Sequence, residues 1–407
     1  MIKLHARLSD KWEAAPFVAR ITLNHLRPEA LRGRELLLAG SAEDLPAGFL
    51  AYLIPQGTEL ASRKPGPSNG RALNLPDSLG YLREGDIVRV NPRAGEVSVM
   101  YRRESRFNAM LLTEQCNSNC VMCSQPPKAA NDDHLVQAWL EAIPLMDTST
   151  PELGITGGEP TLLGNRLLQV ILACKNYLPR TALHMLTNGR MFNYISLCRD
   201  VARINHSDLV IGIPLYSDIA CLHDCVVQAK GAFDQTIRGI MNLERCGLRV
   251  ELRVVLHRQT IGGLPQLARF IARNLPFVEH VALMGLEIMG HVRMNLDALW
   301  IDPVDYQSEL SEAVEELARH RMRVSIYNHP LCVLKRELWP FARQSISDWK
   351  NEYVEVCADC AVRDQCGGFF TSSIIRRSEH IHAISHEDFA CTNMSGTLQH
   401  SDSFTKG

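Results

Sequence analysis

The sequence predicts an α/β fold, because strand and helix patterns alternate along most of the chain after Phe107. Short apolar strand patterns occur at 108–113, 153–156, 182–187, 208–215, 250–257 and 280–287. Helical patterns separate them, near 133–146, 163–175, 191–203, 232–246 and 264–274. Repeated strand–helix units form a parallel sheet, and six of them predict a partial TIM-type barrel with its active site at the carboxyl ends of the strands.

The segment before about Arg103 has a different pattern. Helical signals are weak there, and Pro and Gly are frequent, as in residues 64–70. Apolar and polar residues alternate at 85–90 and again at 96–101, on either side of a Gly/Pro turn, which predicts a β-hairpin. We therefore expect a small β-rich domain at 1–103.

The barrel is expected to span residues 104–300, with an extension at 301–407. The pair Asp302 and Pro303 is typical of a helix start, because aspartate caps the first amides and proline fits the first helical position. This helix is predicted to end near His320, and a further strand pattern follows at 322–327.

The composition limits the classes of function. The 43 basic and 45 acidic residues balance, so no charged surface for nucleic acid or an anionic membrane is expected. The amino terminus lacks the apolar core of a signal peptide, and no apolar run approaches a membrane span, which predicts a soluble, cytoplasmic protein. Thirteen cysteines, an odd number, favour metal ligation and buried thiols over disulfides.

The most informative stretch follows the first predicted strand. Cys116, Cys120 and Cys123 have a C-x3-C-x2-C spacing, and no fourth cysteine comes close behind them. Three thiolates from one short loop suit an iron–sulfur cluster in which one iron keeps an open coordination position. Zinc is the alternative, but it would need a fourth ligand or a catalytic water, and the nearest histidine, His134, lies beyond a Pro-Pro break.

A second motif ends the next predicted strand. Gly157, Gly158, Glu159 and Pro160 follow the apolar segment 153–156. Glycine lacks a Cβ atom and reaches positive φ values, so the two glycines let the backbone approach a ligand closely.

Together these motifs resemble the radical S-adenosylmethionine (SAM) enzymes. The resemblance implies that the three cysteines hold a [4Fe-4S] cluster and that SAM chelates the fourth iron. It also implies that the strand end at 157–160 lies against the SAM amino group. The residue before the third cysteine is often aromatic in that superfamily and packs on the adenine. Here it is Met122, whose thioether can fill the same space.

The predicted fifth strand places Glu251, Arg253 and His257 on one face. Buried charges need partners, so one interpretation is a salt bridge in the barrel core. The interpretation we prefer is that Arg253 or His257 meets the polar parts of SAM or substrate. Asn188 and Glu287 also end strands and are further candidates for cofactor binding, although Asn188 with the following glycine is equally typical of a turn.

The chain as a whole resembles one family: the C-type radical SAM maturases of the His-Xaa-Ser system. The matching blocks are 116–128, 154–164, 186–190, 212–218, 283–287 and 345–351, together with the terminal cysteines. The resemblance implies a ribosomally synthesised peptide with His-Xaa-Ser repeats as substrate and a second radical SAM maturase as partner. It also implies an external reductant, a flavodoxin or ferredoxin. The bond formed in the peptide is not implied.

Four cysteines near the C-terminus form a second candidate centre: Cys332, Cys357, Cys360 and Cys366. Four thiolates fill all four irons of a [4Fe-4S] cube, so an auxiliary cluster here would lack an open iron. Structural zinc is the competitor, since the C-x2-C spacing suits both; the resemblance favours iron. Cys391 is a possible replacement ligand.

Two other functions share most of these features. A radical SAM enzyme acting on a small metabolite would have every motif except the family-specific blocks. A non-catalytic iron–sulfur scaffold that binds peptide would hold the cluster without cleaving SAM. Activity measured with and without peptide distinguishes these possibilities.

Overall fold

The structure is a computed structural model that describes residues 3–8, 11–39, 45–56, 71–344, 352–387 and 389. The chain packs into two compact units. The first comprises Met1–Arg253 with Phe277–Glu279, and the second comprises Val254–Pro276 with His280–Gly407. No helix within the described ranges is both long and apolar enough to cross a membrane.

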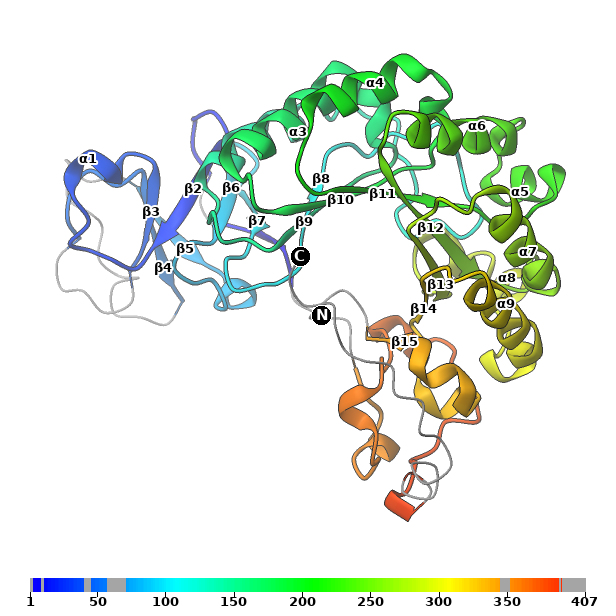
Figure 1. Ribbon diagram of the computed structural model, residues 1–407. Helices are drawn as coiled ribbons and strands as arrows, with labels where there is room; N and C mark the ends of the chain where they lie inside the picture. The colour runs from blue at the N-terminus through cyan, green and yellow to red at the C-terminus, as the bar shows by residue number, and fades with distance from the viewer. Residues whose placement is uncertain are drawn as a thin grey trace. The chain divides into compact units, whose positions relative to one another are not determined.

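The first unit begins with a sheet in the strand order β1-β7-β6-β2-β3-β4-β5 (Figure 1). Its strands are β1 (His5–Arg7), β2 (Phe17–Thr22), β3 (Glu35–Leu38), β4 (Ala51–Pro55), β5 (Arg71–Leu75), β6 (Ile87–Asn91) and β7 (Glu96–Tyr101), with one short helix, α1 (Glu29–Arg32). Strands β6 and β7 pair antiparallel, which confirms the predicted hairpin. Strands β2 to β5 pair parallel to one another, a feature that the sequence patterns did not indicate.

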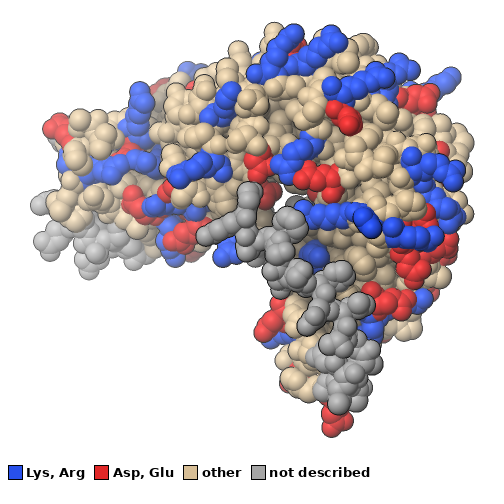
Figure 2. All heavy atoms as spheres, in the orientation of Figure 1, with Lys and Arg blue, Asp and Glu red and all other residues tan. Residues whose placement is uncertain are grey.

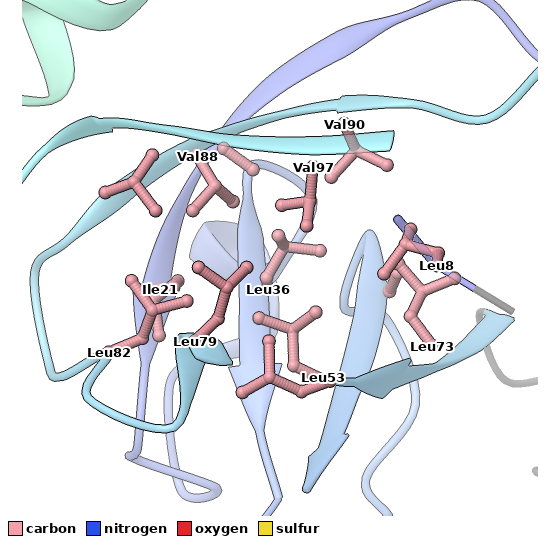
Figure 3. Packing of buried hydrophobic residues seen from close by; sticks show 14 residues of the cluster. Leu8, Ile21, Leu36, Leu53, Leu73, Leu79, Leu82, Val88, Val90 and Val97 are labelled. Carbon is pink, nitrogen blue, oxygen red and sulfur yellow. The ribbon is translucent and has the colours of Figure 1, made fainter. Parts of the chain in front are cut away.

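One face of this sheet carries the core of the N-terminal segment. Leu36, Leu53, Leu73 and Val88 are fully buried there and pack with Leu79 (Figure 3). Burial alternates along β7, in agreement with the alternation of apolar and polar residues from which the hairpin was predicted, because successive strand residues face opposite sides of a sheet.

The rest of the first unit is the predicted α/β segment. Its strands are all parallel, in the order β8-β9-β10-β11-β12: β8 (Asn108–Leu111), β9 (Glu152–Thr156), β10 (Ala182–Leu186), β11 (Leu209–Pro214) and β12 (Arg249–Leu256). The helices between them are α2 (Asp133–Ala142), α3 (Asn165–Tyr177), α4 (Ile195–Ile204), α5 (Ala220–Val227) and α6 (Ala232–Arg245) (Figure 1). The five predicted strands and four predicted helices of this segment are confirmed, and α5 is an addition.

The second unit continues with parallel strands in the order β13-β14-β15. Its regular elements are α7 (Leu264–Asn274), β13 (His280–Gly285), α8 (Leu296–Leu299), α9 (Gln307–Arg319), β14 (Val324–Tyr327) and β15 (Ala342–Arg343). Asp302 caps as predicted, accepting a hydrogen bond from the amide of Val304 at 3.1 Å. It caps a 3-10 turn at Pro303–Tyr306, and the α-helix begins only after that turn.

Charges of both signs are interspersed over the face of the molecule in Figure 2, with no area there given over to a single sign. This distribution agrees with the near balance of 43 basic and 45 acidic residues in the sequence.

Candidate radical SAM site

The cysteine loop leaves the carboxyl end of β8 and is fixed by backbone hydrogen bonds to the end of α5. The amides of Asn119 and Val121 donate to the carbonyls of Val227 and Val226, at 3.1 and 2.9 Å. Helix α5, which the sequence patterns missed, therefore holds the middle of this loop.

The three thiols of the loop converge. Burial is the main cause that raises the pKa of Cys120 to about 12, and the neighbouring Cys123 and Cys116 contribute to that value because thiolates repel one another. Cys116 and Cys123 are half-buried. Convergent thiols that are costly to ionise alone suit a bound metal centre, whose positive charge replaces the protons.

A single metal ion and an iron–sulfur cluster place different demands on these thiols. Among the described residues, no three or more His, Cys, Asp or Glu side chains are grouped closely enough to share one metal ion. In a [4Fe-4S] cluster each thiolate binds its own iron, so Cys116, Cys120 and Cys123 would hold such a cluster without sharing one metal ion.

The Gly-Gly-Glu-Pro segment lies directly against the residues that lead into the cysteine loop. The amides of Gly158 and Glu159 donate to the carbonyls of Thr113 and Gln115 at 2.7 and 2.8 Å. A Cβ atom at Gly157 would lie 2.6 Å from the Thr113 carbonyl, and one at Gly158 would overlap the Gln115 carbonyl. The two glycines therefore allow a close approach to the protein's own backbone, and their contact with a ligand stays a prediction.

Gly158→Ala is expected to destabilise the first unit, because the added methyl group meets backbone that cannot turn away. The cost should be roughly 1–3 kcal/mol in the free energy of unfolding, measured by chemical denaturation. Gly33→Ala is the matched control, since open space surrounds that position. Equal stability of the two variants would contradict the steric explanation.

Glu159 is fully buried and surrounded by donors. Its carboxylate accepts hydrogen bonds from the Thr161 amide (3.0 Å), the Thr187 hydroxyl (2.6 Å) and the Asn188 amide (2.6 Å). Burial raises the pKa of Glu159, and the hydrogen bonds from Thr161, Thr187 and Asn188 oppose that rise. The carboxylate joins the ends of β9 and β10, and Pro160, also buried, begins the turn that follows.

Asn188 lies beside the cysteine loop, as its position at a strand end predicted. Its side-chain amide donates to Asn117 Oδ1 at 2.7 Å and lies 4.0 Å from Cys116 Sγ. The turn interpretation also holds, because Gly189 has a φ of +76°, which favours glycine. The turn directs Arg190 back to the loop, where its guanidinium donates to the Asn117 carbonyl and to Ser118 Oγ.

Two buried side chains complete the surroundings of the thiols. Met122 is only 6% exposed. Tyr216 follows β11, and burial raises its pKa well above the ordinary value, with Cys120 and Cys123 adding to the rise and Arg253 opposing it. Tyr216 therefore lies near both the cysteine loop and Arg253. Its strand-end position, shared with Asn188, was the signal available in the sequence.

The charged face of β12 contains the ion pair that the sequence analysis considered. Arg253 Nη1 lies 3.1 Å from Glu251 Oε1, and His184 Nε2 lies 3.2 Å from the same oxygen. Gly212, on the strand between them, makes room for this layer, since a Cβ atom there would meet His184 Nε2 at 3.1 Å. The salt-bridge interpretation of Arg253 is confirmed, and a contact with SAM remains a prediction.

His257 and Glu287 lie in the second unit. His257 is fully buried, its Nε2 atom lies 3.4 Å from Thr260 Oγ1, and its carbonyl accepts from the Ile261 amide at 3.0 Å. Glu287 is half-buried. Their part in cofactor binding stays a prediction.

Because His257 is buried, we expect it to weaken the fold in acid. Burial lowers its pKa from 6.5 to about 4, so the neutral ring is favoured in the folded chain. The contribution of His257 to the free energy of unfolding is complete above pH 6.5. It falls by up to about 3 kcal/mol as the pH falls toward 4. His257→Gln should flatten the pH dependence of the denaturation midpoint between pH 7 and 4.5. A slope matching that of the wild type, or of the control variant at exposed His134, would contradict this role.

The C-terminal cysteines also lie near one another. Cys332 is among them, although it is the farthest from the others in sequence. Burial raises the pKa of Cys332 to about 11, and Cys366, Cys357 and Cys360 each add to the rise. Cys366 Sγ accepts hydrogen bonds from the amides of Leu331 and Gly368, both at 3.4 Å. A four-thiolate centre at these cysteines stays a prediction. Cys391 lies outside the described residues, as does the block at 345–351.

Comparison with known proteins agrees with this site. Residues 110–271 match the family model described as the Radical SAM superfamily. That range includes the cysteine loop, the Gly-Gly-Glu-Pro segment and Asn188. The chain therefore carries a radical SAM superfamily domain.

Individual relatives are distant. The Fe-coproporphyrin III synthase of Methanosarcina barkeri is 25% identical over 160 residues, which are 38% of this chain and 38% of that protein. The chain thus spans well under half the length of this curated relative in the match. Streptococcus suis SuiB bound to S-adenosylmethionine has a TM-score of 0.45 at 13% identity, covering 56% of this chain and 51% of that chain. A radical SAM methyltransferase from Sphaerobacter thermophilus has a TM-score of 0.42 at 13% identity, covering 61% and 74%.

Proposed function

We propose that this protein is a radical SAM enzyme that modifies a ribosomally synthesised His-Xaa-Ser repeat peptide together with a second radical SAM maturase. The observation that supports the proposal most is the convergence of Cys116, Cys120 and Cys123 at the end of β8, inside the region that matches the superfamily model. In this proposal the barrel comprises six strand–helix units at 104–300, and a flavodoxin or ferredoxin is the reductant.

When bound, a [4Fe-4S] cluster supplies the electron that cleaves the sulfur–carbon bond of SAM into methionine and a 5′-deoxyadenosyl radical, which takes a hydrogen atom from the substrate. The protein holds and orients the cofactors and the substrate, and it excludes water from the site. Cys116, Cys120 and Cys123 are the cluster ligands. The hydrogen bonds of Asn188 and Arg190 fix the loop between them.

The remaining residues act around this centre. Glu159 fixes the strand end at 157–160, which we propose lies against the SAM amino group. Met122 and Tyr216 are buried beside the thiols and keep water away from them. Arg253 is paired with Glu251, so it can turn to a SAM or substrate carboxylate only by sharing or leaving that pair.

The peptide substrate rests on the sequence blocks that resemble the His-Xaa-Ser maturases. Two of them, 212–218 and 283–287, follow or end β11 and β13, at the carboxyl ends of strands where substrates bind in such sheets. The C-terminal cysteines would hold an auxiliary cluster in the proposed extension at 301–407.

A second candidate is a radical SAM enzyme for a small metabolite. The curated relative, which is named for a porphyrin product, favours it. The non-catalytic scaffold is the third possibility. It differs from both enzymes in leaving SAM intact.

The test is anaerobic reconstitution with iron, sulfide, a one-electron reductant and SAM, with and without the candidate peptide and the partner maturase. The proposal predicts 5′-deoxyadenosine and a changed peptide mass. Cleavage of SAM with an unchanged peptide would favour the metabolite enzyme, and intact SAM beside a bound cluster would favour the scaffold.

A further inference from the structure

We propose that Arg190 is a positioning residue for the cluster-binding loop and that its charge favours the reduced form of the cluster. The inference rests on the proposed function, because it assigns the cluster to Cys116, Cys120 and Cys123. It adds a residue that neither the spacing of the cysteines nor the Gly-Gly-Glu-Pro segment indicates.

The contacts of Arg190 reach into the loop between two of the ligands. Its Nη1 atom donates to the Asn117 carbonyl and to Ser118 Oγ, the latter at 3.0 Å. Both acceptors lie between Cys116 and Cys120 in the sequence. Guanidinium presents several donors in a fixed plane, so one side chain can hold a backbone carbonyl and a hydroxyl in a set relation.

Helix α6 holds the arginine from the other side. Arg190 Nε donates to Gln235 Oε1 at 2.8 Å, and Thr236 Oγ1 donates to the Asn188 carbonyl at 3.1 Å. A Cβ atom at Gly239 would overlap the Gly189 carbonyl, so the helix and the turn are in close contact. The loop is therefore connected through Arg190 to a packed helix, and its conformation does not depend on the cluster alone.

Among the described residues, the Arg190 guanidinium donates hydrogen bonds to neutral groups. Within the described ranges, no carboxylate forms an ion pair with its guanidinium, whose partners are a carbonyl, a hydroxyl and an amide oxygen. Reduction of the cluster adds one electron from the external reductant and hence one negative charge. Net charge and hydrogen bonding near a cluster set its potential, and Arg190 therefore favours the reduced form.

Three variants separate the positioning role from the charge. Arg190→Gln removes the charge and some donors. Arg190→Lys keeps the charge but loses the planar donors. Gln235→Leu keeps Arg190 and releases its Nε atom from α6. Arg199→Gln is the matched control, because Arg199 is an exposed arginine on α4 in the same unit.

The readouts are the iron content and the midpoint potential of the signal that the Cys116, Cys120 and Cys123 triple alanine variant lacks, titrated by electron paramagnetic resonance on the reconstituted protein without SAM or peptide. We expect less iron in all three variants, a more negative potential in Arg190→Gln, and a wild-type potential in Arg190→Lys and Gln235→Leu. The control should match the wild type in both.

Several results would overturn the inference. Wild-type iron content and potential in Arg190→Gln would refute both the positioning role and the charge role of Arg190. A potential shift in Arg199→Gln as large as that in Arg190→Gln would show that the effect of charge is not specific to Arg190. If Arg190→Gln holds too little iron to titrate, a potential in Arg190→Lys below that of the wild type still rules out the charge role. Absence of a cluster in the wild type would instead refute the proposed function itself.

Discussion

Replacement of Cys116, Cys120 and Cys123 by alanine is expected to abolish reductive cleavage of SAM. In the proposed function each thiol would bind its own iron, and without the cluster no electron would reach the sulfonium of SAM. The measurement is 5′-deoxyadenosine by mass spectrometry after anaerobic reconstitution, which should fall to the level without enzyme.

The control for this variant replaces cysteines that are exposed and lie on α5, Cys221 and Cys225. Their replacement by alanine should leave 5′-deoxyadenosine formation within about twofold of the wild type, since surface substitutions usually change stability little. Formation of 5′-deoxyadenosine by the triple alanine variant at the wild-type rate would refute the assignment of the ligands.

The same triple variant is expected to keep about four irons per chain. Cys357 and Cys360 lie close enough to Cys332 and Cys366 to help raise the pKa of those two thiols, and four thiolates complete a [4Fe-4S] cluster. Metal analysis of the reconstituted variant checks this.

Adding Cys357→Ala and Cys360→Ala to the triple variant should remove the remaining iron. One zinc per chain and no iron in the triple variant would show a structural zinc site in place of the auxiliary cluster, because zinc takes four thiolates at a single ion.

Much of the α/β segment was predictable because its signals are local. Buried parallel strands are short apolar runs, and helices of ten or more residues show a clear period. Helix α5 was not predicted, because its eight residues contain apolar and polar side chains without a clear amphipathic order. The parallel pairing of strands β2 to β5 was not predicted for a different reason. Parallel pairing joins segments that are distant in sequence, and no local pattern encodes it.

The candidate site divides in the same way. The cysteine spacing and the Gly-Gly-Glu-Pro segment can be recognised in the sequence alone, and Asn188 was identified by its place at a strand end. Arg190 and Tyr216 were missed, because their relation to the thiols arises only when β10, β11 and the loop come together. For the two glycines, the structure shows a close approach to the backbone of Thr113 and Gln115, and their approach to a ligand stays a prediction.

Arg253 illustrates a further limit. Alternation along β12 placed it on one face with Glu251, and the structure confirms that face. Whether a charged side chain there meets a ligand or a neighbouring carboxylate depends on the adjacent strands. His184 on β10 lies beside Glu251, and Gly212 on β11 leaves the space that the His184 ring occupies.

We propose that this protein generates a radical that takes a hydrogen atom from a peptide. The most direct measurement uses a His-Xaa-Ser repeat peptide deuterated at its carbon positions, incubated anaerobically with the reconstituted protein, the partner maturase, reductant and unlabelled SAM. The account predicts deuterium in the 5′-deoxyadenosine and a matching loss of deuterium from the peptide. Unlabelled 5′-deoxyadenosine beside a peptide that keeps all its deuterium would contradict it.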